Sequence, residues 1–570
     1  MRIATIVVFV FSLLLLLTPD TSAQAVIDPN FELSTVIQPK DYPGVWPDSV
    51  GAWMIKANYD INKNGKKEFF VLVDPATASV NPYTPPGDTS TPVIMWFEAT
   101  GPDHYALIWS ARIPGSNPGV FSWANFTIGD LDNDGLPEVW VSVPRGRGGE
   151  ADPSPARLYA YEFNGTTFPA DPDMVSNLGL RDNFRYLTTS VSVDDVDGDG
   201  VPEIITTSRR DDFSGLQLGR SLMVFNLVGD VSPFGALDRE FIDSSAVLKG
   251  GYVFSNYILD YDGNGKKEIW VPTWDMLALA AFEATGPDTY VNKVDLNQVT
   301  NPNDIGEHNG VRFYDVDGDK KPEMYWSGMS GDGTIPSAVY YMKSTSDIST
   351  LTASDVFKVS PDVDPMGGNG FAGADIGDVD NNGKMDFICG SAAEIKSVFR
   401  LEYQSGALSD AASYTWTTIY QAGPADSIID FENVAIGDDL DGDGKKEILL
   451  ANLAMLPGGN GPGVVILKSK GGTGVKEISG AVPERYGLSQ NYPNPFNPST
   501  SIEFSLKQSG PVTLKVYDVV GREVATLVND THPAGTYRVT FDASKLPSGT
   551  YIYSVSSGGF TDVKKMLLVK

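Results

Sequence analysis

A nine-residue pattern that recurs seven times is the feature that most constrains this chain. In the copy Asp195–Glu203, oxygen-bearing side chains occupy positions 1, 3, 5 and 9, and glycine occupies position 6. A tight turn can direct positions 1, 3 and 5 toward one point, and glycine permits the sharp bend that closes it. Seven copies in phase indicate a repeat protein, where one copy would be weak evidence. The copies begin at Asp60, Asp130, Asp195, Asp260, Asp315, Asp378 and Asp439.

Each copy lies between two short runs rich in β-branched and aromatic residues. Around the third copy these runs are Val191–Val193 and Ile204–Thr206. Such flanks predict a β-hairpin with the acidic loop at its tip. An EF-hand would need flanking helices and a glutamate at position 12, where the first two copies have Val71 and Val141, so the EF-hand class is excluded.

A third strand-like run follows every hairpin, and a weaker fourth run follows in several units. Four strands in about 60 residues, repeated seven times, are typical of a β-propeller. We therefore predict an all-β chain: a seven-bladed β-propeller followed by a small Ig-like β-sandwich. The run Phe31–Ile37 stands where a fourth strand precedes each later loop, and we expect it to pair with the blade that holds Asp439, which removes an exposed edge. Two units share the heptapeptide Phe-Glu-Ala-Thr-Gly-Pro-Asp, at 97–103 and 282–288.

The chain divides into four parts by composition. We expect a signal peptide at 1–23, the propeller at 24–470, a glycine-rich linker at 471–483 and a terminal domain at 484–570. Arg2 and the apolar run Ile3–Leu17 precede the small-residue cleavage site Thr21-Ser22-Ala23, as in a secretory signal. The apolar run is short for a membrane span, so we expect an exported protein that does not span a membrane; an uncleaved anchor is the alternative.

Charge and rare residues narrow the functional classes. The formal net charge of −31 argues against nucleic-acid binding. The single cysteine, Cys389, excludes an intramolecular disulfide, and its strand-like surroundings predict a buried, unreactive thiol. None of the three histidines has a partner at the spacing of a metal or triad motif. We expect Trp140, Trp270 and Trp326 to pack between blades.

Residues of about 31–470 resemble the FG-GAP/VCBS repeats that build integrin-α-type seven-bladed propellers. In that family the loop binds calcium through the side chains at positions 1, 3, 5 and 9 and the carbonyl of position 7. The resemblance implies up to seven Ca²⁺ ions. The implied ligands are Asp60, Asn62, Asn64, Glu68, Asp130, Asp132, Asp134, Glu138, Asp195, Asp197, Asp199, Glu203, Asp260, Asp262, Asn264, Glu268, Asp315, Asp317, Asp319, Glu323, Asp378, Asp380, Asn382, Asp386, Asp439, Asp441, Asp443 and Glu447.

Some loops depart from the family pattern. Asn62 and Asn64 replace carboxylates in the first loop, and Lys320 stands where the fifth loop should have glycine, at a backbone conformation that lysine adopts at a cost. We expect the ions to be structural, because the loops recur around the chain and do not converge on one pocket. A catalytic ion would need an open coordination position beside an acid or base.

The last 87 residues resemble the type A C-terminal sorting domain of the type IX secretion system. The resemblance rests on Tyr492–Phe496, Val519–Val524, Gly549–Tyr551 and the basic, apolar end Lys564–Lys570. It implies export to the periplasm, contact with the secretion machinery, passage through the outer membrane, and a secreted or surface-held product. A plain Ig-like spacer is the alternative.

The function expected from these features is a non-catalytic, calcium-binding module for adhesion to an extracellular protein or glycan. The resemblance places ligands on the face opposite the calcium loops, where arginines would suit anionic partners and aromatics would suit sugars. A lyase-like, polysaccharide-degrading enzyme on a propeller scaffold is the alternative, and a part of an extracellular fibre is a third. The candidate ligand contacts are Arg145, Arg147, Arg209, Arg210, Trp274 and Tyr83.

Overall fold

The computed structural model shows an all-β chain. Within the described residues the elements are strands and four short 3₁₀ turns. The turns are η1 (Pro39–Asp41), η2 (Ile348–Thr350), η3 (Ala353–Asp355) and η4 (Ala411–Ser413). No helix in the described part of the chain is long and apolar enough to cross a membrane. The structure describes residues 25–47, 50–74, 91–114, 124–143, 157–177, 180–181, 184–188, 190–211, 217–244, 255–273, 279–296, 310–328, 338–362, 371–391, 396–423, 430–453, 461–470, 475–479, 483–532, 534–543 and 546–570.

The described residues of the first 470 form seven antiparallel sheets, which we call blades 1 to 7. Blade 1 contains β3 (Met54–Tyr59), β4 (Glu68–Val73), β5 (Val93–Gly101) and β6 (His104–Arg112). Blade 2 contains β7 (Asn125–Gly129), β8 (Glu138–Val143), β9 (Arg157–Glu162) and β10 (Met174–Asn177). Blade 3 contains β13 (Ser192–Asp194), β14 (Glu203–Asp211), β15 (Gln217–Val228) and β16 (Ala236–Asp243), extended by β11 (Leu180–Arg181) and β12 (Phe184–Thr188).

The remaining blades repeat the same order. Blade 4 contains β17 (Tyr257–Leu259), β18 (Glu268–Pro272), β19 (Leu279–Gly286) and β20 (Thr289–Leu296). Blade 5 contains β21 (Val311–Tyr314), β22 (Glu323–Gly328), β23 (Ala338–Met342) and β24 (Val356–Lys358). Blade 6 contains β25 (Phe371–Gly377), β26 (Asp386–Ser391), β27 (Ser397–Tyr403), β28 (Tyr414–Gln421) and β1 (Val26–Ile27). Blade 7 contains β29 (Phe431–Gly437), β30 (Glu447–Asn452), β31 (Val464–Ser469) and β2 (Phe31–Ile37).

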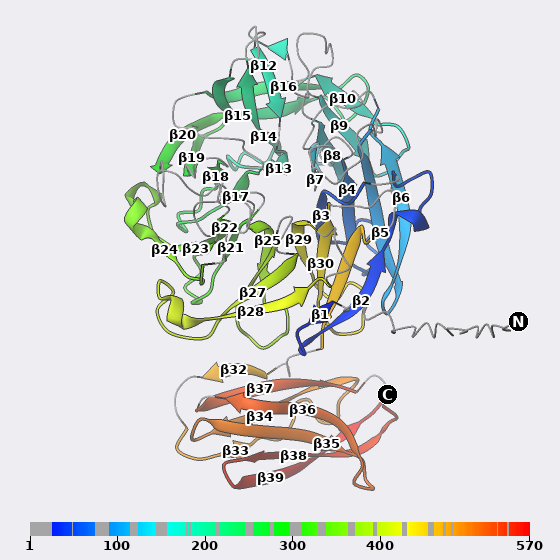
Figure 1. Cartoon of the computed structure of the whole chain (residues 1–570), viewed down its shortest axis with the longest axis vertical. Helices are drawn as coiled ribbons and strands as arrows, with labels where there is room; N and C mark the ends of the chain where they lie inside the picture. Colours follow the sequence, from blue (N-terminus) through cyan, green and yellow to red (C-terminus); the bar gives the residue numbers. More distant parts are fainter. Residues whose placement is uncertain are drawn as a thin grey trace, which may run out of the picture.

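The seven blades follow one another around a ring, with the first strand of each nearest the centre (Figure 1). Residues from the innermost part of all seven blades line one central cavity, which confirms a closed arrangement. Closure uses the strand expected from the sequence: β2 pairs antiparallel with β31, from Phe31 opposite Ser469 to Ile37 opposite Val464. The fold is therefore the predicted β-propeller.

Packing between blades forms the core. The second strand of most blades is buried along its whole length, as in β4, β8, β22, β26 and β30, because both of its faces meet a neighbouring sheet. Trp140 lies in an apolar cluster shared by blades 2 and 3, and Trp270 and Trp326 lie in one shared by blades 4 and 5. Cys389 is buried in a third cluster, as predicted.

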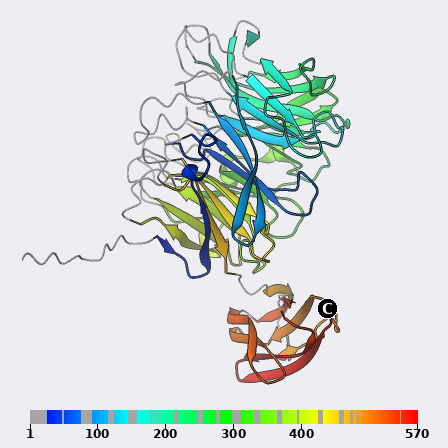
Figure 2. The same cartoon turned by 90° about the vertical axis from the view of Figure 1, so that its right-hand side faces the viewer.

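The terminal domain is a sandwich of two four-stranded antiparallel sheets, coloured orange to red in Figure 2. Apolar side chains alternate inward along its strands, which is the pattern of sheets with one buried face. Val475–Ser479 pairs with β37, so this domain's sheet begins inside the segment expected to be a linker. The strands are β32 (Val475–Ser479), β33 (Gly487–Leu488), β34 (Ser499–Leu506), β35 (Gly510–Tyr517), β36 (Glu523–His532), β37 (Gly535–Asp542), β38 (Gly549–Ser557) and β39 (Phe560–Leu568).

Candidate metal centres

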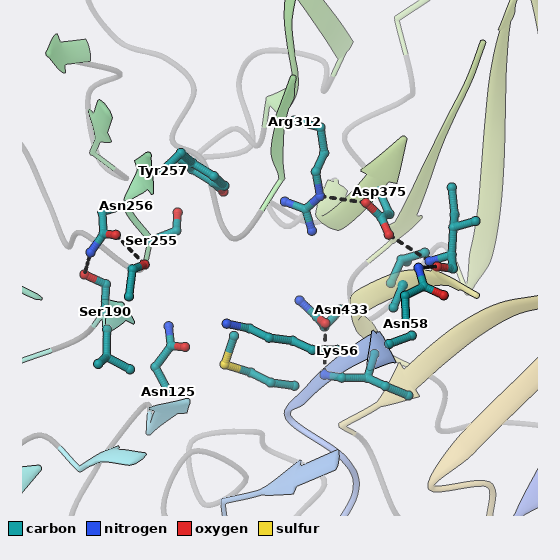
Figure 3. A pocket seen from close by; sticks show the side chains of 18 of the residues that line it. Lys56, Asn58, Asn125, Ser190, Ser255, Asn256, Tyr257, Arg312, Asp375 and Asn433 are labelled. Carbon is teal, nitrogen blue, oxygen red and sulfur yellow. Dashed lines mark hydrogen bonds and ion pairs between the residues drawn. The ribbon is translucent and has the colours of Figure 1, made fainter. Parts of the chain in front are cut away.

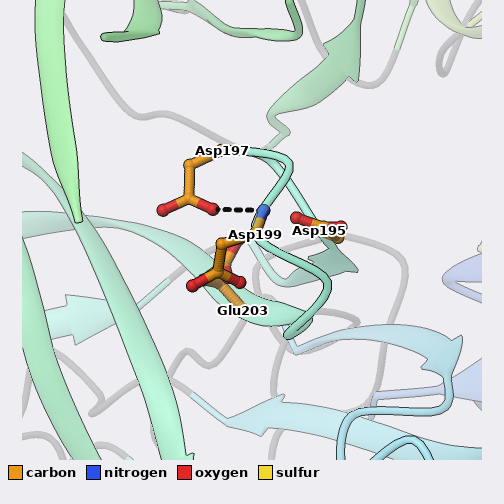
Figure 4. Close-up of side chains that lie close together, drawn as sticks. All are labelled: Asp195, Asp197, Asp199 and Glu203. Carbon is orange, nitrogen blue, oxygen red and sulfur yellow. Dashed lines mark hydrogen bonds between the residues drawn. The ribbon is translucent and has the colours of Figure 1, made fainter. Parts of the chain in front are cut away.

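Each acidic loop joins the first and second strands of a blade, as the sequence predicted. In blade 3, β13 ends at Asp194 and β14 begins at Glu203, and the four carboxylates of the loop gather on one side of the turn (Figure 4). One oxygen from each of Asp195, Asp197, Asp199 and Glu203 lies within 4.8 Å of the others, and the loop of blade 7 has the same grouping. This is the oxygen-rich geometry that a hard cation takes.

The loops are held by their own side chains in a pattern repeated seven times. The position 9 carboxylate accepts from the position 2 N–H at 2.8–2.9 Å in every loop, as Glu203 does from Val196. Position 3 accepts from the position 5 N–H. Position 5 accepts from the position 7 N–H. These bonds leave one oxygen of each of these carboxylates for another partner.

Two positions of every loop have left-handed backbone. Position 6 has φ between 71° and 92°, and position 4, which sequence reasoning did not single out, has φ between 55° and 79°. Lys320 takes this conformation with φ 71° in the fifth loop, and its N–H still donates to Asp315 Oδ2 at 2.9 Å. The fifth loop therefore closes like the others, with a strained lysine in place of glycine.

The position 9 carboxyl group is only partly hydrogen-bonded in most loops. It is buried in all seven loops. Among the described residues, its second oxygen has no hydrogen-bond partner in Glu68, Glu138, Glu268, Glu323 and Glu447. Burial raises the pKa of Glu138 and Glu203 to about 8. A buried carboxylate beside other carboxylates is unfavourable unless a cation neutralises it, and carboxylate oxygens are the type of donor that Ca²⁺ takes.

In blades 6 and 7 a basic side chain on the third strand contacts the carboxylates of the acidic loop. Arg400 on β27 donates from Nε to Asp386 Oδ1 at 2.6 Å and contacts Asp380 Oδ2 at 2.8 Å, and its side chain is 8% exposed. Lys468 on β31 is 1% exposed, and its ammonium contacts Asp441, Asp443 Oδ2 at 3.0 Å and Glu447 Oε1 at 3.8 Å. Sequence reasoning missed both residues.

Where the loop has asparagine at position 5, a glutamate on the third strand accepts a hydrogen bond from the asparagine amide. Asn64 Nδ2 donates to Glu98 Oε2 at 2.8 Å, and Asn264 Nδ2 donates to Glu283 Oε2 at 2.9 Å. Asn382 pairs with Glu402 in the same way. The sequence held a signal for the first two pairs, because Glu98 and Glu283 are the second residue of the shared heptapeptide.

The outer oxygen of position 3 reaches the next blade. Asp441 Oδ2 accepts from the N–H of Asp103 at 2.7 Å, and Asp262 Oδ2 accepts from Ile348 at 3.2 Å. These donors lie in or beside the connection between the third and fourth strands of the following blade. Each such loop therefore fixes its own hairpin and the neighbouring blade at once.

The second candidate site is the cavity at the centre of the ring, about 310 Å³ in volume. Lys56, Tyr257 and Arg312 reach into it from three blades (Figure 3). Lys56 Nζ donates to Phe126 O at 2.5 Å, and Arg312 Nε donates to Asp375 Oδ1 at 3.0 Å. The other polar residues of the lining are Asn58, Tyr59, Asn125, Ser190, Ser192, Ser255, Asn256 and Asn433.

The six ligand contacts suggested by the sequence stay predictions. Tyr83, Arg145, Arg147 and Trp274 lie outside the described residues. Arg209 and Arg210 lie on β14, where only the backbone is described.

The two ends of the terminal domain meet. Phe496, in the opening segment, forms a parallel bridge with Leu568, its N–H donates to Leu567 O at 3.0 Å, and Leu567 N–H donates to Asn494 Oδ1 at 2.9 Å. Residues 490–570 match the family described as the secretion system C-terminal sorting domain. This is the type IX sorting domain that the sequence resembles. The sorting domain directs the chain to export, and the protein is secreted or held at the cell surface.

Solved structures with some likeness to the whole chain include two sugar-cleaving enzymes and an adhesion protein. An exo-inulinase from Aspergillus awamori is 12% identical over 79% of this chain and 92% of its own, with a TM-score of 0.29. A β-fructofuranosidase from Bombyx mori is 11% identical over 79% and 80%, with a TM-score of 0.28. A tandem-repeat region of a large adhesion protein is 10% identical over 78% and 99%, with a TM-score of 0.12. TM-scores this low carry no functional implication. No curated protein matches the sequence.

Proposed function

We propose that the protein is a calcium-stabilised β-propeller that binds an extracellular protein or glycan without catalysis, delivered to the outside by its sorting domain. The observation that carries this proposal is the repetition of one acidic loop geometry in all seven blades, with the ligand oxygens spread around the ring. Such an arrangement stabilises a scaffold and presents no single reactive ion.

Calcium would supply positive charge at the hairpin tips. In blades 1 to 5 it would neutralise the buried position 9 carboxylate and tie together the side chains of positions 1, 3 and 5. Because position 3 also contacts the next blade in several joints, the ion would stiffen the ring as well as the loop. In blades 6 and 7, Arg400 and Lys468 already neutralise these carboxylates, so we propose that calcium occupies the loops of blades 1 to 5.

The metal assignment is tested by isothermal titration of chelated, full-length protein with CaCl₂. We expect one ion for each of the first five loops. Glu138→Gln, which keeps the size of the side chain but removes its charge, should remove one of these ions. Binding of seven equivalent ions would contradict the distinction between the blades, and no binding would contradict the metal itself.

One observation favours the enzyme alternative: Lys56, Tyr257 and Arg312 line a single cavity, and burial together with the charge of Arg312 lowers the pKa of Lys56 to about 8. A lysine with such a pKa can act as a general base near neutral pH. Glycan-array binding and a reducing-end release assay on the same preparation separate the two functions. We expect saturable binding with no release of product. Product release that is lost in Lys56→Met would replace the binding function with an enzymatic one.

A further inference from the structure

The central cavity differs in charge from the rest of the molecule. The chain carries a net charge of −31, yet the charged side chains in the described lining are Lys56, Arg312 and Asp375, two positive and one negative. We propose that this cavity binds a carboxylate-bearing sugar, with Lys56 and Arg312 holding the carboxylate. The inference deepens the proposed binding function and rests on it.

Lys56 lacks a counter-ion. Its ammonium lies 5.1 Å above the Phe126 ring and donates to the Phe126 carbonyl, which uses one of three available protons. It forms no ion pair with any described residue. Burial and the neighbouring Arg312 lower its pKa to about 8, so both disfavour the charged form. An anion placed between the two cations would remove that penalty.

Asp375 does not balance both cations. Its Oδ1 accepts from Arg312 Nε at 3.0 Å, and its Oδ2 accepts from the Ile436 N–H at 2.7 Å. The Asp375 carboxylate is therefore held by Arg312 of blade 5, a contact drawn as a dashed line in Figure 3, and by the Ile436 N–H of blade 7. It forms no ion pair with Lys56 among the described residues. Among the described residues of the lining, two side chains are positive and one is negative. A partly enclosed cavity with this charge in an acidic protein concentrates small anions.

The neutral lining fits a hydroxylated ligand. The lining contains the amides of Asn125, Asn256 and Asn433, the hydroxyl of Ser255 and the aromatic ring of Tyr257. The protein itself already uses part of this polarity, because Asn256 Nδ2 donates to Ser190 Oγ and Asn433 Oδ1 accepts from the Ile55 N–H. Amides and hydroxyls match the hydroxyl groups of a sugar, and an aromatic face suits the C–H side of its ring. The volume of about 310 Å³ lies at the lower end of the range for small-molecule sites, so it suits one sugar unit better than a long segment.

The acidic loops do not compete for such a ligand. Their carboxylates would repel a uronic acid, and calcium bound there would already be surrounded by protein oxygens. The recognition chemistry therefore differs between the two sites: cations at the centre, anions at the hairpin tips.

The test is isothermal titration of full-length, calcium-loaded protein at pH 7 with galacturonic acid and digalacturonate, and with galactose as the neutral control. We expect saturable binding of the acids and none of galactose. Lys56→Met should weaken the binding at least tenfold, and Lys56→Gln provides a second variant if the first does not fold. Lys358→Met is the matched control, because Lys358 forms an exposed pair with Asp362 on the outermost strand of blade 5; it should bind as the wild type does.

Three results would overturn the inference: no binding of either acid by folded wild-type protein, equal affinity for galactose, or unchanged affinity in a folded Lys56 variant. Failure of the proposed binding function gives a different result from failure of the cavity assignment. If the glycan array finds a ligand that Lys56→Met binds normally, the cavity assignment fails and the proposed binding function stands; if the array and a set of extracellular proteins give no ligand at all, both fail.

Discussion

The backbone N–H of Asp288 donates to Asp197 Oδ2 at 2.7 Å, and the two residues lie in neighbouring blades. Asp103 makes the same bond to Asp441 across the closure of the ring. Both donors end the shared heptapeptide, whose glutamate contacts the loop of its own blade. This short segment therefore connects two successive acidic loops, which makes the metal centres and the packing of blades a single network.

Removal of calcium should destabilise the propeller. Each occupied loop contributes roughly 1.4 kcal/mol when free calcium is tenfold above its dissociation constant, so EDTA should lower the melting temperature of the propeller transition in scanning calorimetry of the full chain. The transition of the sorting domain, which has no acidic loop of this kind, is the internal control. An identical trace with and without EDTA would refute a stabilising role for the ion.

Lys468→Met should be strongly destabilising. The substitution leaves Asp103, Asp441 and Asp443 facing one another without their shared cation, and loss of one partner of a buried ion pair costs about 3–5 kcal/mol. Urea unfolding measures the change, and Lys358→Met should alter the free energy of unfolding by less than about 0.5 kcal/mol, as exposed pairs usually do. Millimolar calcium should recover part of the loss, because the vacated loop then resembles those of blades 2 and 3. A loss below about 1 kcal/mol for Lys468→Met would contradict the buried-cation account.

Lys320→Gly should stabilise the fifth loop. Left-handed backbone costs a non-glycine residue about 1–2 kcal/mol, and the greater freedom of glycine in the unfolded chain offsets part of that gain, so we expect a net increase of about 0.5–1 kcal/mol in the free energy of unfolding. The reverse change, Gly265→Lys in blade 4, should be destabilising by a similar amount, since an added Cβ there meets no neighbour and only the backbone is strained. Equal stability of both variants and the wild type would show that the loop relaxes around position 6.

Lys56 should make stability depend on pH in the alkaline range. Its folded-state pKa of about 8 is below its ordinary value of 10.5, so the unfolded chain holds one more proton between these values and the wild type gains stability as pH rises from 8 to 10.5. Below pH 8 the buried ammonium costs about 3 kcal/mol. Lys56→Met should therefore be at least as stable as the wild type at pH 7, with the difference shrinking toward pH 10.5. The stability of the wild type and of Lys56→Met is measured by urea unfolding across this pH range. If the two curves run parallel, the titration of Lys56 is ruled out.

The ring and its closure could be predicted because their signals are local. Hairpin, loop and strand order recur in each unit, and Phe31–Ile37 stands at a fixed place relative to Asp60. Lys468 and Arg400 could not be found this way, because they reach the loops through the register of a third strand. The central cavity is harder still, since Lys56, Arg312 and Asp375 each come from a different blade and meet only when the ring closes.

The strand that completes blade 7, β2, lies near the start of the described residues, while the other three strands of blade 7 end at Ser469. Proteolysis between Lys470 and Val475 would therefore release the export signal and leave all seven sheets whole. Removal of the N-terminal residues through Ile37 would delete β2, the outermost strand of blade 7, and open the ring. The propeller can therefore lose the sorting domain and stay closed, but it cannot lose β2.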